Sequence, residues 1–281
     1  MFIPLHDANS LKYIKLQYVT IGLIAANVIV FILTSLGPQE FTNAAVFELG
    51  YIPSTVYDIA ERPPELTLVP DYATYLTYAF LHSDILHLGG NMLFLWVFGD
   101  NVEDALGHFR FLVFYLLCAI AGAFMHGYLA PDSQDPLIGA SGAIAGVVTA
   151  YLVLHPRVKV WILAFARIPL RVPAYIVLAL WILFQFAMFV TGGDDKISWA
   201  AHVGGIIAGA LLVFILSIGY YVTPALLGGA DDQMLSYYIA QYTNVNVNWG
   251  MASALGALLL AATMVLYAVY RRIVRSELSL G

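Results

Sequence analysis

Charged side chains are scarce in this chain. Among its 281 residues only 11% are Asp, Glu, Lys or Arg, whereas 61% are hydrophobic. A soluble domain carries about 25% charged residues, so this chain has too few polar side chains to cover a water-soluble globule. The composition therefore predicts a protein whose solvent is largely lipid.

Cysteine and clustered basic residues are also scarce. The one cysteine, Cys118, lies in an apolar run, which argues against a disulfide framework and a cysteine-based metal site. The net charge is −6 and no basic patch is present, so nucleic acid is not an expected partner. We expect no metal site.

Long apolar runs dominate the sequence instead. A helix needs about 20 apolar residues to cross the hydrocarbon core of a bilayer. The runs predict spans at Tyr18–Leu36, Tyr78–Phe98, Arg110–Leu129, Gly139–Leu154, Val172–Val190, Ser198–Tyr221 and Met251–Tyr270. The predicted fold is an all-α polytopic helical bundle in the membrane. We divide it into an N-terminal segment (1–17), a core (18–221), a connecting loop (222–250) and a seventh span with its tail (251–281).

The distribution of basic residues predicts the orientation of the spans. With the N-terminus in the cytoplasm, the cytoplasmic side holds Lys12, Lys15, Arg110, Arg157, Lys159, Arg167 and Arg171. Only Arg62 and Lys196 then lie outside before the last span, as the positive-inside rule requires. The tail disagrees, because Arg271, Arg272 and Arg275 would lie outside. The sequence thus leaves open whether 251–270 crosses the membrane.

Polar side chains inside membrane spans are costly and are functional candidates by default. The second span contains His82, His87 and Asn91, the fourth begins near Ser141, and His202 lies early in the sixth. These three spans enter the membrane from the same side, and the polar residues lie near their N-terminal ends. We therefore expect them to lie at one depth. His87 and Asn91 are four residues apart, which places them on one helix face.

These residue types together indicate acyl-transfer chemistry. A serine hydroxyl becomes a good nucleophile when a neighbouring base removes its proton, and His202 can act as that base for Ser141. The oxyanion that forms needs donors, which His87, the amide of Asn91 and the Ser141 backbone N–H can supply. No membrane-embedded aspartate is available to orient His202, so we expect a dyad rather than a triad. This chemistry requires no cofactor.

Small residues should bring the two catalytic candidates together. Gly142 and Gly146 in the fourth span, and Gly205 and Gly209 in the sixth, have the spacing that permits close backbone approach. Taken singly, each feature also fits ordinary helix packing or a structural hydrogen bond. Their combination at one depth on three alternate spans favours a site.

The order of these motifs resembles the rhomboid family. The residues that carry the resemblance are His82, His87, Asn91, Met92, Phe98, Gly99, Glu103, Gly139, Ser141, Gly142, Ala201, His202, Gly205 and Gly209. The resemblance implies a six-helix core with an added seventh helix. It implies an intramembrane serine protease that cuts membrane-protein substrates in the lipid bilayer, with Ser141 as nucleophile and His202 as base. It also implies oxyanion roles for His87 and Asn91, and a supporting role for His82.

The surrounding sequence is similar to prokaryotic family members, which implies a plasma membrane, with the active site open to the outer side. Two departures stand out. Ala73-Thr74 replaces a Trp-Arg pair in the first loop, so that loop is expected to be anchored differently. Ala145 replaces an aromatic residue that packs on the histidine in some members, which leaves open what orients His202.

Two other function classes remain as alternatives. A catalytically silent rhomboid-like binding protein would be expected to lack Ser141 or His202, and both are present. A small-solute transporter would also carry broken helices and buried polar groups, but no inverted repeat is visible. The sequence does not specify the substrate, the cleavage site or the oligomeric state.

Overall fold

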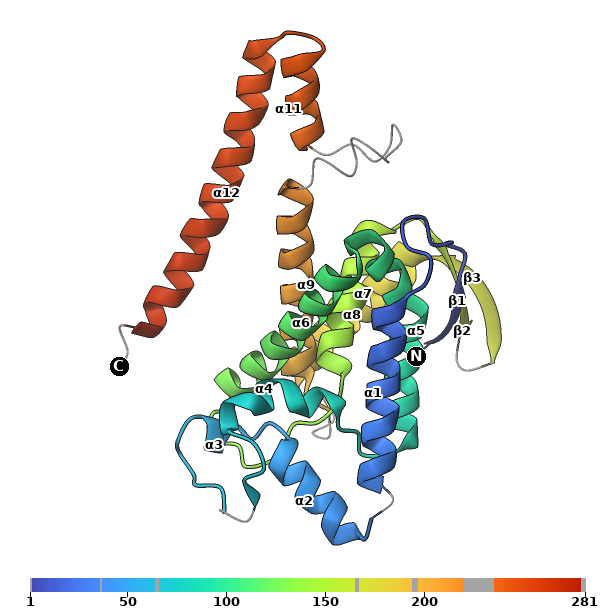
Figure 1. Cartoon of the computed structure of the whole chain (residues 1–281), viewed down its shortest axis with the longest axis vertical. Helices are drawn as coiled ribbons and strands as arrows, with labels where there is room; N and C mark the ends of the chain where they lie inside the picture. The colour runs from blue at the N-terminus through green and yellow to red at the C-terminus, as the bar shows by residue number, and fades with distance from the viewer. Residues whose placement is uncertain are drawn as a thin grey trace. The chain divides into compact units, whose positions relative to one another are not determined.

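The computed structural model describes residues 2–35, 37–63, 66–164, 167–193, 197–219 and 235–278, and the chain is mainly helical (Figure 1). The elements are β1 (Phe2–Asp7), α1 (Tyr18–Ser35), α2 (Gln39–Leu49), α3 (Pro53–Val56), η2 (Asp71–Ala73), α4 (Thr74–Thr77), η3 (Tyr78–Phe80), α5 (Ile85–Leu106), α6 (His108–Leu129), α7 (Ser141–Leu154), β2 (Lys159–Ala164), β3 (Ile168–Pro173), α8 (Ala174–Thr191), α9 (Trp199–Gly219), α11 (Leu235–Asn244) and α12 (Trp249–Leu278). The predicted helical bundle is confirmed, and a small sheet is added to it.

The chain divides into two compact units, Met1–Leu212 and Val213–Gly281. The second unit contains α11 and α12, which pack against each other. The predicted connecting loop, 222–250, includes α11, while its residues 222–234 lie outside the described residues, as does Lys196. That 251–270 crosses the membrane stays a prediction, as do the predicted domain boundaries.

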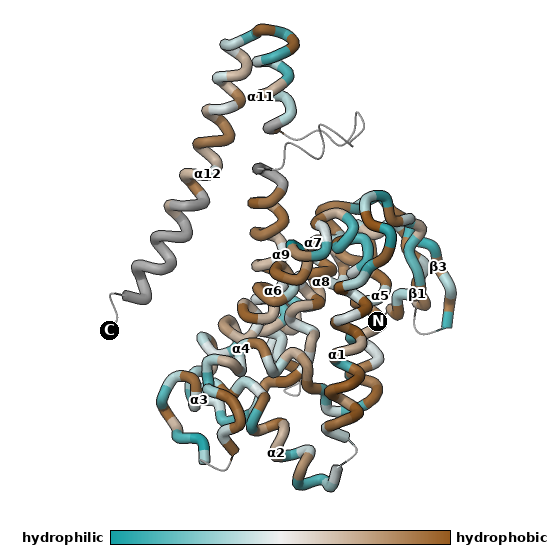
Figure 2. Tube along the Cα trace, in the orientation of Figure 1, coloured by the Kyte–Doolittle hydropathy of each residue, from teal (hydrophilic) through white to brown (hydrophobic). Residues whose placement is uncertain are grey.

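Four of the described helices, α1, α6, α8 and α9, are long and apolar enough to cross a membrane. Figure 2 shows hydrophobic residues running along them. Much of this apolar surface faces outward: in the most apolar window of α8 only 22% of the residues are buried. Outward-facing apolar side chains fit a lipid environment. Helix α7 has only 14 residues, in line with the predicted span Gly139–Leu154, which is the shortest of the seven.

The second span differs from the prediction of one helix over Tyr78–Phe98. The chain forms the short η3, then an extended stretch, and α5 begins only at Ile85. Asp84 sets this start, because its carboxylate accepts hydrogen bonds from the backbone N–H groups of Leu86 (2.8 Å) and His87 (2.9 Å). His82 therefore precedes the helix instead of lying within it.

The fifth span also begins later than predicted. Strands β2 and β3 form an antiparallel hairpin, and β1 pairs with β2 to give the order β1-β2-β3. Because β3 continues to Pro173, helix α8 starts at Ala174 instead of Val172. Pro173 has no N–H and is tolerated just before a helix. The fourth span likewise starts at Ser141, two residues after the predicted Gly139.

A buried carboxylate ties β1 to the helices. Asp7 is 3% exposed and accepts hydrogen bonds from the Tyr151 hydroxyl on α7 (2.6 Å) and from Asn101 Nδ2 on α5 (2.8 Å). Burial raises the pKa of Asp7, although its hydrogen bond with Tyr151 opposes this effect. The N-terminal segment is thus fixed to the C-terminal halves of α5 and α7.

Glu103 joins α5 to α1. It is fully buried and accepts hydrogen bonds from the Val19 N–H (3.0 Å), the Thr20 N–H (2.7 Å) and the Thr20 hydroxyl (2.7 Å). Glu103 thus satisfies backbone donors in the first turn of α1 that have no partner within the helix. Its neighbour Asp104 accepts hydrogen bonds from backbone N–H groups in the segment before α1, among them that of Tyr13 (2.7 Å).

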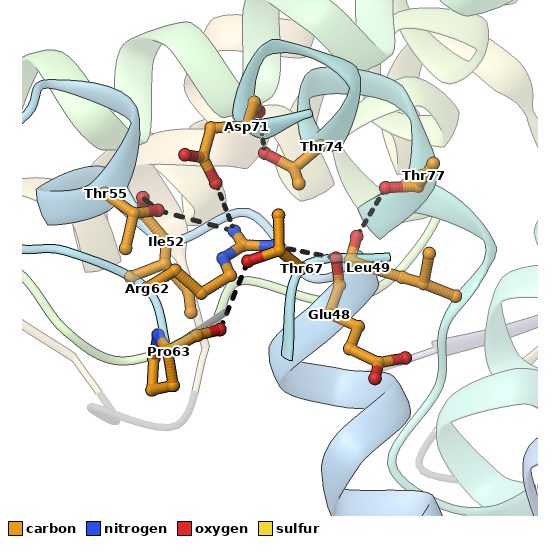
Figure 3. A network of polar contacts seen from close by, with 10 residues as sticks. All are labelled: Glu48, Leu49, Ile52, Thr55, Arg62, Pro63, Thr67, Asp71, Thr74 and Thr77. Carbon is orange, nitrogen blue, oxygen red and sulfur yellow. Dashed lines mark hydrogen bonds and ion pairs between the residues drawn. The ribbon is translucent and has the colours of Figure 1, made fainter. Parts of the chain in front are cut away.

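Arg62 anchors the first loop (Figure 3). Its side chain is 4% exposed and pairs with Asp71 at 2.9 Å. It also donates hydrogen bonds to the Glu48 carbonyl (2.8 Å) and to the Thr55 hydroxyl (3.4 Å). The buried guanidinium of Arg62 therefore connects α2, α3 and the chain before α4. It anchors the loop in which Ala73-Thr74 replaces the Trp-Arg pair.

Candidate active site

Ser141 and His202 lie in direct contact. Ser141 is the first residue of α7, and His202 lies in the first turn of α9. The distance between Ser141 Oγ and His202 Nε2 is 2.8 Å. Both side chains are partly exposed, while the ten residues that follow Ser141 on α7 are buried. The position of Ser141 at a helix N-terminus favours negative charge beside it.

Four glycines bring α7 and α9 together. A Cβ added at Gly205 would stand 1.8 Å from the Gly142 carbonyl oxygen, and one at Gly209 would stand 2.5 Å from that of Gly146. A Cβ at Gly146 would in turn meet the Gly205 carbonyl oxygen at 3.0 Å. The helices therefore touch through their backbones, as the spacing of small residues predicts.

A residue that the sequence analysis missed, Gln185 on α8, binds the other side of the imidazole. Its Oε1 lies 2.8 Å from His202 Nδ1. The Trp199 and His202 rings also pack edge to face, with ring centroids 5.8 Å apart. Gln185 and Trp199 are therefore the side chains that contact the His202 ring in this chain, which has Ala145 where some family members have an aromatic residue. The signal in the sequence that could have identified Gln185 is its polar side chain within the apolar run of α8.

His87 and Asn91 lie one turn apart on α5, and both approach Gly139. A Cβ at Gly139 would stand 2.7 Å from His87 Nε2 and 3.9 Å from Asn91 Nδ2. Gly139 has φ +117°, a conformation that other residues rarely adopt. The loop before Ser141 therefore needs glycine at this position both for its backbone angle and for the close approach of His87.

The Asn91 amide is a buried donor. Asn91 is 8% exposed, and its Nδ2 has no hydrogen-bond partner among the residues that the structure describes. An unpaired buried donor is costly, and such groups are found where a ligand or a transition state will supply the acceptor. This donor lies beside the loop that leads into Ser141.

His82 packs against His87 instead of lying on the helix face with it. It is 6% exposed, and the edge of one ring meets the other with centroids 5.0 Å apart. On its other side, His87 Nδ1 lies 3.1 Å from the Ser83 hydroxyl. This arrangement directs His87 Nε2 toward Gly139 and is compatible with the supporting role predicted for His82.

Another serine–histidine pair links α9 to α6. The Ser198 hydroxyl is 2.8 Å from His126 Nδ1 and also accepts a hydrogen bond from the Ala201 N–H (3.2 Å). Ser198 precedes α9 and links it to α6. It provides a matched comparison for Ser141.

No group of three or more His, Cys, Asp or Glu residues that could hold a metal occurs in the described part of the chain. Cys118 is fully buried, and its sulfur would lie 2.4 Å from a Cβ added at Gly146. This thiol fills space beside the α7–α9 contact.

The fold and the site define a class: a multi-pass helical membrane protein with a hydrogen-bonded Ser–His pair and amide and imidazole groups beside it. The Rhomboid domain family matches residues 70–219, which is more than half of the chain. The chain therefore belongs to the rhomboid family.

Three relatives illustrate the likeness. The chain is 30% identical over 196 residues to Rhomboid protein 1, mitochondrial, of Saccharomyces cerevisiae, covering 65% of this chain and 51% of that one. It is 30% identical over 173 residues to Rhomboid protease AarA of Providencia stuartii (57% and 60% covered). It is 35% identical over 136 residues to Rhomboid protease GluP of Bacillus subtilis (48% and 24% covered). The chain spans about half the length of the first of these relatives and three fifths of the second.

Proposed function

We propose that this protein is an intramembrane serine endopeptidase that hydrolyses peptide bonds in or near transmembrane segments of membrane-protein substrates. The observation that carries the proposal is the 2.8 Å contact between Ser141 Oγ and His202 Nε2 at the N-terminus of α7. The names of two relatives, Rhomboid protease AarA and Rhomboid protease GluP, support it.

The proposed reaction is a two-step acyl transfer. Ser141 Oγ attacks the carbonyl carbon of the scissile bond while its proton moves to His202 Nε2. The tetrahedral intermediate then loses the amine, which takes the proton from His202, and an acyl-enzyme remains on Ser141. A water molecule attacks this ester in the second step. It gives one proton to His202, which returns it to Ser141 Oγ, and the acid product leaves.

The oxyanion of each tetrahedral intermediate needs donors. We assign this role to Asn91 Nδ2, His87 Nε2 and the Ser141 backbone N–H. Gly139 supports the role by letting the loop pass close to His87, and Gly142, Gly205 and Gly209 support it by holding α7 against α9. Neither a metal nor another cofactor takes part in the proposed chemistry.

We place the protein in the plasma membrane of a prokaryote, with a cytoplasmic N-terminus and an active site open to the outer side. The basic residues on the predicted inner loops support this orientation. Single cysteines introduced at Gln134 and Arg157, both exposed, provide the test in cells, because the native Cys118 is buried. An impermeant thiol reagent should label Gln134→Cys alone, and labelling of Arg157→Cys alone would refute the orientation.

A fluorophosphonate probe tests the nucleophile directly. An activated serine attacks the probe's phosphorus, so purified protein in lipid should be labelled at Ser141, and His202→Ala should abolish the labelling. Ser198→Ala is the matched control, because it removes a serine hydroxyl that contacts a histidine outside the proposed site, and it should be labelled like the wild type. Absence of label on wild-type Ser141 would favour a silent binding protein or a transporter.

Replacement of Asn91 by alanine tests the oxyanion site. We expect kcat to fall by about 10²- to 10³-fold with little change in KM, because the amide bonds the oxyanion mainly in the transition state. The same change at Asn101, which is also buried on α5 but bonds Asp7, should lower thermal stability without a comparable loss of kcat. A loss confined to KM would place Asn91 in substrate binding instead.

A further inference from the structure

Gln185 is a buried amide on a membrane-spanning helix. It lies on α8, is 3% exposed, and is surrounded in sequence by apolar residues. An amide removed from water is costly unless its polar atoms are hydrogen-bonded. Both polar ends of Gln185 have a partner: Oε1 contacts His202 Nδ1 at 2.8 Å, and Nε2 donates to the Trp181 carbonyl at 3.3 Å.

These two contacts determine which way the amide faces. The Trp181 carbonyl can only accept a hydrogen bond, so the Gln185 NH₂ group must point toward it. The Gln185 oxygen then faces His202 and can only accept, which requires the proton of the neutral imidazole to be on Nδ1. A flipped amide would place two acceptors against each other at Trp181 and would lose that hydrogen bond.

The tautomer of His202 determines whether its imidazole can act as a general base. With the proton on Nδ1, His202 Nε2 carries a lone pair toward Ser141 Oγ, 2.8 Å away. The other tautomer would point an N–H at the serine and could not remove its proton. A catalytic triad uses a carboxylate to select the tautomer, but a carboxylate would place a charge in the membrane. A neutral amide oxygen selects the same tautomer without that cost.

Helix α8 also supports the imidazole ring of His202 from a second side. Phe184 packs edge-on against Trp199, with ring centroids 5.8 Å apart, and Trp199 packs edge-on against His202 at the same separation. Ala145 on α7 is too small to stack on the imidazole. Helix α8 thus contributes both a hydrogen bond to the imidazole and a support for its aromatic contact.

We propose that Gln185 is a positioning residue that holds His202 in the tautomer and orientation required of a general base, in place of a triad carboxylate. This inference rests on the proposed function of Ser141 and His202. Gln185 touches neither substrate nor the reacting atoms and acts only through the imidazole.

The variant Gln185→Met removes the acceptor and keeps an unbranched side chain of similar length. We expect kcat to fall by about 10- to 100-fold with little change in KM. The rate of fluorophosphonate labelling at Ser141 should fall by the same factor. Gln185→Glu keeps an acceptor oxygen toward His202 Nδ1 and should recover most of both rates. Its second oxygen would face the Trp181 carbonyl, where Gln185 Nε2 now donates, so its melting temperature should fall. Cleavage of a reporter transmembrane substrate in proteoliposomes, the labelling rate and the melting temperature are the measurements.

A matched control is Thr149→Val. Thr149 is also buried, on α7, and donates to the Ala145 carbonyl (2.8 Å) without touching His202. Its loss should leave kcat within about threefold. Wild-type kcat and labelling in Gln185→Met would overturn the inference. An equal loss in the Met and Glu variants, with a lower melting temperature in both, would also overturn it, because the role would then be structural. Failure to label wild-type Ser141 would instead overturn the proposed function, and the inference with it.

Discussion

Replacement of Ser141 by alanine should lower cleavage of a reporter transmembrane substrate by roughly 10⁴-fold or more, because serine hydrolases lose such factors when the nucleophile is removed. Only the oxyanion donors and substrate binding would remain. The protein should still fold, since the change removes one partly exposed hydroxyl whose contact is His202. Cleavage in proteoliposomes and thermal melting in detergent measure the two effects separately.

His202→Ala should cause a loss of similar size, and the double variant should be no worse than either single variant. Residues that act as one unit show this non-additivity, because removal of either member already stops the proton transfer. His126→Ala, which breaks the neighbouring Ser198 contact, is the control and should retain cleavage. Substantial cleavage by Ser141→Ala would rule out the serine mechanism.

The contact between Ser141 and His202 could be predicted because membrane topology supplies information that a soluble sequence lacks. Alternate spans begin on the same side, so residues near their N-terminal ends lie at similar depths. The glycine spacing on the fourth and sixth spans then indicates which helices touch. The structure places Gly205 against Gly142 and the two polar residues in contact. Their catalytic roles stay predictions.

Elements that depend on local capping or distant pairing were missed. Apolar content alone placed His82 within a helix, whereas the carboxylate of Asp84 caps α5 just after it. Strand β1 pairs Phe2 with Ala164, and no local pattern reveals a partner so far along the chain. Gln185 was missed for another reason: it is a single neutral amide in an apolar span, and no spacing pattern in that span indicates that its side chain faces His202.

The contact between α7 and α9 leads to the second large prediction. Gly205→Ala should impair proteolysis and lower the melting temperature, although the residue touches no catalytic atom. A carbon and an oxygen need roughly 3.3 Å, whereas the new Cβ would stand 1.8 Å from the Gly142 carbonyl oxygen. That oxygen belongs to a helix backbone and cannot rotate away, so α7 and α9 must separate by about 1 Å or more.

A separation of this size is expected to lower the cleavage rate by about 10²-fold, because it moves His202 relative to Ser141, and Gly205→Val should be worse. Gly22→Ala and Gly22→Val on α1 are the matched controls, because a Cβ at Gly22 meets nothing within 4 Å. Fluorophosphonate labelling, cleavage and melting should be near normal in the Gly22 variants and reduced in the Gly205 variants. Wild-type values in Gly205→Ala would show that the α7–α9 contact does not hold the dyad together.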